Sequence, residues 1–131
     1  AHTLGAHFHI PHGRANGILL PYVMAFNAGC HDKLTPVAKR YARIARVLRL
    51  EGPSIRQSAF SVIRTTRQYI KQLHIPDSIE SAGVSRDDFE NALEEMAQAA
   101  FADACTRTNP RECSVEEIKD VFRHAYTGRL I

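Results

Sequence analysis

The chain has 131 residues, 44% of them apolar and 24% charged, with a formal net charge of +3 at pH 7. These proportions are typical of a single globular domain and exclude a disordered tail. The charge is too small to indicate nucleic-acid binding, and the longest uncharged stretch is interrupted by Pro21 and too short to cross a bilayer. We therefore expect no nucleic-acid partner and no membrane partner.

The first thirteen residues show no helical periodicity, and we expect an irregular segment there that leads into a helix at about Arg14 to Ala28. Along the rest of the chain, helix starts are marked by Ser or Thr directly before an amphipathic run. Thr35-Pro36 places a cap and a first-turn proline before a run that ends at Glu51-Gly52-Pro53.

The next helix begins after Ser54 and keeps one apolar face as far as the break at Ile75-Pro76. A short turn of helix is expected from Ser78 to Ala82. Gly83 would close this turn, because glycine adopts the left-handed conformation of a helix end without strain.

The last two helices are also marked by serine caps. Ser85 precedes a run that continues to just before Cys105, and Ser114 opens a capping box before a helix that ends near Gly128. No segment alternates with the period of a strand. The sequence therefore predicts an all-α fold, a single compact bundle of five to six helices.

The chain contains three cysteines, Cys30, Cys105 and Cys113, and no C-x-x-C pair. An odd, widely spaced set argues against a secreted disulfide framework and against a structural zinc site. A reducing cytoplasm is therefore the expected location.

Four histidines lie within the first twelve residues: His2, His7, His9 and His12. Imidazole is the side chain most often recruited to metals and to proton transfer near neutral pH. Pro11 and Gly13 flank His12 and set the backbone just before a helix start. A histidine held in this way loses little side-chain freedom on binding, so His12 is the strongest candidate for a metal ligand.

The spacing of these histidines leaves their arrangement open. His7 and His9 share a face if the segment is extended, whereas His9 and His12 can meet if it is helical. A third interpretation is that the cluster is a set of surface residues without a chemical role.

Several segments of the chain resemble the C-terminal helical domain of the iron-containing (group III) alcohol dehydrogenases. The longest lies at the beginning and includes Leu4-Gly5-Ala6, Ile10-Pro11-His12-Gly13, Ala15-Asn16, Ile18-Leu19-Leu20-Pro21 and Phe26-Asn27. The others are Lys39-Arg40-Tyr41-Ala42-Arg43-Ile44-Ala45, the Ile75-Pro76 break, Asp103-Ala104-Cys105-Thr106, Thr108-Asn109-Pro110-Arg111 and Ser114-Val115-Glu116-Glu117-Ile118. The resemblance covers essentially the whole chain and implies a helical domain of the dehydroquinate synthase-like type.

The resemblance implies that residues 1–131 are the C-terminal helical metal-binding domain of a longer enzyme, whose N-terminal nucleotide-binding domain is absent from this sequence. The enzyme would interconvert small primary alcohols and aldehydes with NAD or NADP. One divalent metal, Fe²⁺ or Zn²⁺, would be held by one aspartate and three histidines. The partners are then the N-terminal domain and a small alcohol or aldehyde, and the fragment alone is expected to be inactive. A homo-oligomer, and an added aldehyde dehydrogenase module as in bifunctional members, are left open.

The resemblance also assigns roles to individual residues. His12 corresponds to the last metal ligand of the family, in the Pro-His-Gly turn. His2 corresponds to the second histidine of an H-x-x-x-H pair, which lies beside the nicotinamide and the substrate, and it inherits a proton-relay or positioning role. Cys105 lies in a segment that approaches the cofactor and is expected to contact it. His7 and His9 match variable positions and inherit nothing.

The alternative is a standalone helical module without catalytic activity, which would bind a metal through His7, His9 and His12 or a partner through a basic stripe. The stripe consists of Lys39, Arg40, Arg43, Arg46 and Arg49. Basic residues in this pattern are also typical of a solvated helix face. Metal binding separates the two hypotheses, because a standalone site should bind tightly and a domain that lacks ligands should bind loosely through His12.

Overall fold

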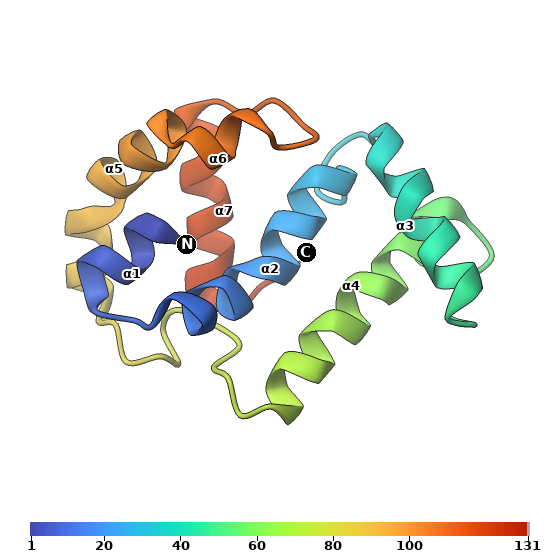
Figure 1. Ribbon diagram of the computed structural model, residues 1–131, viewed down its shortest axis with the longest axis horizontal. Helices are drawn as coiled ribbons and strands as arrows, with labels where there is room; N and C mark the ends of the chain where they lie inside the picture. The colour runs from blue at the N-terminus through green and yellow to red at the C-terminus, as the bar shows by residue number, and fades with distance from the viewer. Residues whose placement is uncertain (131) are drawn as a thin grey trace.

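The described part of the chain, residues 1–130 of a computed structural model, consists of seven α-helices and contains no strand (Figure 1). The helices are α1 (His2–Phe8), α2 (His12–Ala28), α3 (Pro36–Val47), α4 (Ile55–Gln72), α5 (Arg86–Ala102), α6 (Ala104–Arg107) and α7 (Val115–Thr127). The all-α class is confirmed. The five long helices are those that the sequence predicts, and α1 and α6 are two short helices in addition.

Helix α2 is central to the fold (Figure 1). On one side of it, α3 and α4 form a hairpin that packs against α2, and on the other side α7 packs against α2 and α5. Helix α1 contacts both α5 and α2. This arrangement brings the first residues of the chain next to the junction of α5 and α6, where the candidate site lies.

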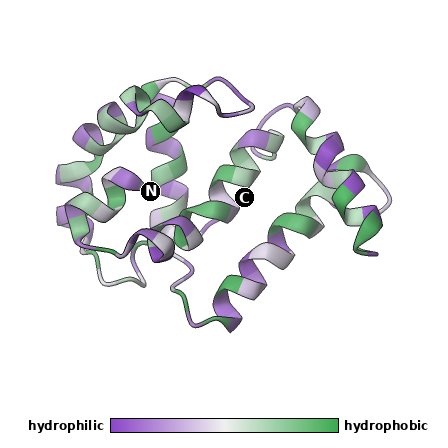
Figure 2. Cartoon of the chain, viewed as in Figure 1, coloured by the Kyte–Doolittle hydropathy of each residue, from purple (hydrophilic) through white to green (hydrophobic). Residues whose placement is uncertain are grey.

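The core is built from the apolar faces of these helices. Hydrophobic and hydrophilic residues alternate along most helices in Figure 2, as expected of helices with one buried face. Phe89 of α5 is 1% exposed and stacks on Tyr126 of α7 with ring centroids 4.5 Å apart. The Tyr126 hydroxyl donates to the Val84 carbonyl at 3.1 Å, so that its one polar group is satisfied inside the core.

Serine caps begin three of the long helices, as the sequence predicts. The hydroxyls of Ser54, Ser85 and Ser114 each accept a hydrogen bond from the backbone N–H three residues later. At Ser114 the Glu117 side chain returns the bond, which completes the predicted capping box. Thr35 precedes α3 but makes no cap bond, because its hydroxyl donates to the Asn27 carbonyl instead.

We expect Ser114→Ala to lower the free energy of unfolding by about 1 kcal/mol, because it leaves an N–H in the first turn of α7 without a partner. The measurement is urea denaturation followed by circular dichroism. The matched control is Ser61→Ala within α4, whose hydroxyl only donates to the Gln57 carbonyl one turn earlier. A loss at Ser61 as large as that at Ser114 would contradict the capping explanation.

The expectation of an irregular histidine segment is wrong. Residues 2–8 form α1, and α2 begins at His12 rather than at about Arg14. Between the two helices His9 adopts a left-handed conformation with φ 54°, and the Ile10 carbonyl oxygen would lie 2.9 Å from a Cβ at Gly5. The tight reversal therefore requires glycine at position 5. The sequence gives no periodic signal because Leu4 is the one buried residue of α1.

Two further segments differ in detail from the expectation. Residues 78–82 form a hydrogen-bonded turn rather than a helix, and Gly83 closes it with φ 97° as predicted. The Ile79 N–H donates to the Ala125 carbonyl at 2.9 Å, so this turn is tied to the end of α7. The helix expected to stop before Cys105 ends at Ala102, and Cys105 itself lies in the short α6.

The outer face of α3 is exposed. The basic residues of the predicted stripe are all exposed, and Arg46 pairs with Glu51 at 3.0 Å. Two apolar residues, Ile44 of α3 and Leu48 directly after it, are also exposed. Within residues 1–130, no helix combines the length and the apolar character needed to cross a membrane.

Candidate metal and cofactor site

A cavity of about 350 Å³ lies between α1, α2, α6 and α7. Its polar lining residues, called the polar wall below, are His2, His12, Asn16, Asp103, Cys105 and Asn109. Its apolar lining, called the apolar wall, includes Leu19, Val23, Phe26, Ile118 and Phe122. Convergent polar groups beside an apolar surface are typical of small-molecule sites.

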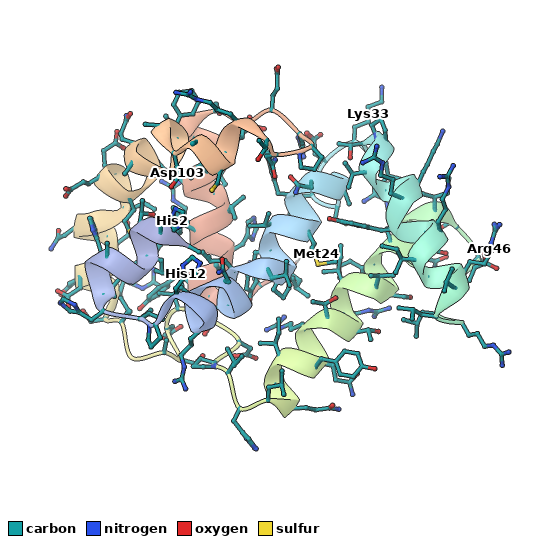
Figure 3. The ribbon with its side chains drawn as sticks, in the orientation of Figure 1. His2, His12, Met24, Lys33, Arg46 and Asp103 are labelled. Carbon is teal, nitrogen blue, oxygen red and sulfur yellow. The ribbon has the colours of Figure 1, made fainter. Side chains whose placement is uncertain are left out.

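His2 and His12 meet on the polar wall of this cavity (Figure 3). Their rings are stacked, with centroids 5.2 Å apart and planes 20° apart. The reversal between α1 and α2 produces this contact. Neither pairing considered from the spacing occurs: His9 is exposed, and His7 Nε2 lies 3.7 Å from the Glu95 carboxylate on α5.

His12 is the first residue of α2, and its side chain is exposed. The Asn16 amide lies one turn further along the helix and donates to His12 Nε2 at 3.0 Å. With this assignment the proton of the neutral ring is on Nδ1. A metal could bind to the Nε2 lone pair in place of the Asn16 amide.

Asp103 is a site residue that the sequence interpretation missed. His2 Nδ1–H donates to one carboxylate oxygen, Oδ2, at 2.7 Å, and the Cys105 backbone N–H donates to the other, Oδ1, at 2.8 Å. These two hydrogen bonds, that of His2 first, lower the pKa of Asp103 to about 2. The only local signal was its position as a helix-capping residue before Cys105.

Cys105 lies on α6, is exposed and lines the cavity. The donor atoms of His2, Asp103 and Cys105 all lie within 4.8 Å of one another. Cys113 also lines the cavity, and burial, with the nearby Glu117 carboxylate, raises the pKa of its thiol. Cys113 therefore stays protonated near neutral pH.

The segment after α6 is fixed to the end of α2. The side-chain amides of Asn27 and Asn109 exchange hydrogen bonds of 3.1 and 2.8 Å. The Arg111 guanidinium lies 4.2 Å from the centroid of the Phe26 ring and donates to the Phe26 carbonyl. These contacts hold Asn109 and Phe26 in place in the lining of the cavity.

The residues of this wall fit part of a metal site. His12 offers an imidazole nitrogen on an exposed helix end, whereas Nδ1 of His2 is already bound to Asp103. Zinc sites in proteins use at least three protein ligands. Within residues 1–130, the imidazole of His12 alone falls short of such a set.

Fold and cavity together define a helical domain that presents paired imidazoles at the edge of an apolar pocket. Residues 1–126 match the sequence profile of the "Fe-containing alcohol dehydrogenase family, C-terminal". The chain belongs to the iron-containing alcohol dehydrogenase family. The expected family is thus confirmed.

Individual relatives agree with this membership. The chain is 37% identical to the NADPH-dependent butanol dehydrogenase of Clostridium saccharobutylicum over 98% of its own length and 31% of that protein. It is 37% identical to a bifunctional aldehyde-alcohol dehydrogenase of Escherichia coli over 98% of its length and 16% of that protein. The structure of an alcohol dehydrogenase from Oenococcus oeni superposes with a TM-score of 0.79 at 30% identity, covering 95% of this chain and 30% of that one. The chain thus spans about a third or less of the length of these relatives.

Proposed function

We propose that residues 1–131 are the C-terminal helical domain of a metal-dependent dehydrogenase that interconverts small primary alcohols and aldehydes with NAD or NADP. An N-terminal nucleotide-binding domain would supply the cofactor site, since the 131 residues contain no Gly-rich phosphate-binding motif. The observation that carries this proposal is the His2 and His12 pair at the edge of an apolar cavity. Free cysteines support a cytoplasmic location.

In this proposal His12 is one of the ligands of a divalent metal, Fe²⁺ or Zn²⁺. When bound, the metal would polarise the alcohol oxygen and the nicotinamide would take up a hydride from the alcohol carbon. Cys105 lies on the same wall of the cavity and is the proposed contact to the nicotinamide side.

The chain's own residues would orient the alcohol and accept its proton. His2 Nδ1 is bound to Asp103, which leaves Nε2 to accept the hydroxyl proton. The apolar wall of Leu19, Val23 and Phe26 would hold the alkyl group and exclude water. A cavity of about 350 Å³ suits a small alcohol, which agrees with the short-chain substrate named for the butanol dehydrogenase relative.

The test is an assay of the full-length protein that contains this sequence. Purified with Fe²⁺ or Zn²⁺, it should oxidise ethanol, propanol or butanol with NAD⁺ or NADP⁺, followed by the absorbance of the reduced cofactor. A chelator should remove the activity, and residues 1–131 alone should have none. Metal-loaded full-length protein that reduces neither cofactor with any of these alcohols, nor oxidises NADH or NADPH with the matching aldehydes, would overturn the proposal.

The binding stoichiometry of residues 1–131 also tests the alternative of a standalone metal module. That hypothesis needs His7, His9 and His12 to converge, whereas His7 faces Glu95 and His9 is exposed. Calorimetric titration of Zn²⁺ should therefore show weak binding that His7→Ala leaves unchanged.

A further inference from the structure

We propose that Asp103 is a positioning residue that fixes the His2 imidazole with its proton on Nδ1, so that Nε2 is the acceptor in the cavity. This inference rests on the proposed function, because it assigns a partner to the proton-accepting histidine. Nothing in the spacing of the sequence points to it, since Asp103 lies 101 residues after His2.

The first argument is that both oxygens of the carboxylate are occupied. Oδ1 accepts from the Cys105 N–H at 2.8 Å and Oδ2 accepts from His2 Nδ1 at 2.7 Å. The bond to the backbone fixes the carboxylate at the start of α6, and a fixed acceptor selects one tautomer of the imidazole. The pKa of about 2 keeps this acceptor ionised at neutral pH.

The second argument is that the His2 side chain is 55% exposed, so that burial alone would not order it. It is held at one edge by Asp103 and on one face by the ring of His12, 5.2 Å away. Figure 3 shows the three side chains gathered between α1, the start of α2 and the end of α5. The ring is thus fixed in two directions, with Nε2 as its one uncommitted nitrogen.

A metal shared by His2, Asp103 and Cys105 fits the same cluster less well. Ligand atoms about 2.0–2.1 Å from a tetrahedral zinc ion are about 3.3 Å apart. The Nδ1 and Oδ2 atoms are 2.7 Å apart, which is the distance of a charge-assisted hydrogen bond. The geometry therefore favours a proton between the two groups.

The position of His2 between the cavity and Asp103 accounts for each bond that changes when the alcohol loses its proton. The O–H bond of the alcohol breaks, an N–H bond forms at His2 Nε2, and the resulting imidazolium lies against the Asp103 carboxylate. The proton then passes to water from the exposed side of the ring. Asp103 stays ionised throughout and stabilises the charged ring.

The test is Asp103→Asn in the full-length protein. The asparagine oxygen still accepts from the Cys105 N–H and keeps the cap of α6, but its NH₂ group faces His2 and forces the proton to Nε2. Nitrogen NMR of ¹⁵N-histidine-labelled protein, with His2 assigned from a His2→Gln variant, should show protonation at Nδ1 before and at Nε2 after the substitution. We expect kcat to fall by about 10² to 10⁴-fold, the range that loss of the correct tautomer produces in Ser-His-Asp triads, with bound metal and KM nearly unchanged.

Two variants control this experiment. Asp87→Asn removes an exposed carboxylate from the first turn of α5 and should leave tautomer and kcat unchanged. Asp103→Glu retains the carboxylate and should keep kcat within about tenfold, which covers the case in which the asparagine variant does not fold. An unchanged tautomer, an unchanged kcat or a loss of bound metal in a folded Asp103→Asn protein would each overturn the proposal. Since the tautomer is measured without turnover, failure of the dehydrogenase proposal remains distinguishable.

Discussion

Replacing His12 by alanine in the full-length protein is expected to abolish metal retention and alcohol oxidation together. The His12 imidazole is exposed at the first position of α2, and in the proposed function its Nε2 exchanges the Asn16 amide for the metal. Loss of an outer-shell partner of a metal already costs about 10- to 100-fold, so loss of a ligand should reduce activity further, to the background of the assay. Metal content by mass spectrometry and turnover of the same sample are the two measurements.

The matched control is His9→Asn, three residues earlier. His9 is exposed and has φ 54°, a conformation that asparagine also tolerates. It should retain full metal content and turnover. A His12→Ala protein with normal metal and normal turnover would remove the basis for assigning a ligand to this turn.

Replacing Leu4 by alanine is expected to lower the free energy of unfolding of the 131-residue chain by about 2–5 kcal/mol. Leu4 is 0% exposed and is the one buried residue of α1, which packs against α5 and α2. The substitution removes both apolar surface and packing in a site that the short helix cannot refill. Urea denaturation measures the change.

Leu20→Ala on α2 is the control, because this leucine is 45% exposed and its loss should cost about 0.5 kcal/mol or less. Equal losses at the two positions would mean that α1 does not pack as described. In the full-length protein Leu4→Ala should also lower kcat, since His2 depends on α1 for its place beside Asp103.

The five long helices could be predicted because their signals are local. Ser54, Ser85 and Ser114 each cap a helix through a bond to a backbone N–H three residues away, and such a pair is visible in a short stretch of sequence. Helix α1 was missed because its stability comes from Leu4 against other helices, and a single buried residue in seven gives no period.

In the candidate site, too, local features could be predicted from the sequence and a contact between distant residues could not. His12 was identifiable from Pro11 and Gly13 beside it, and the resemblance to the family drew attention to His2 and Cys105. The contact between His2 and Asp103 could not be predicted from the sequence. It joins the first residue of α1 to the residue that follows α5, and only the tertiary fold brings these two positions together. That His12 binds metal, His2 accepts a proton and Cys105 contacts the cofactor stay predictions.

The two contacts of His2 differ in sequence separation but depend on the same packing. Its stacking on His12 spans ten residues and involves α1, α2 and the reversal between them. Its bond to Asp103 closes a loop of 101 residues. Helix α1 is held in place through Leu4, its one buried residue, and packs against α5 as well as α2. Both contacts of the imidazole, and with them the proposed transfer of a proton, therefore require the complete native core, although one of them joins residues that are near neighbours in the sequence.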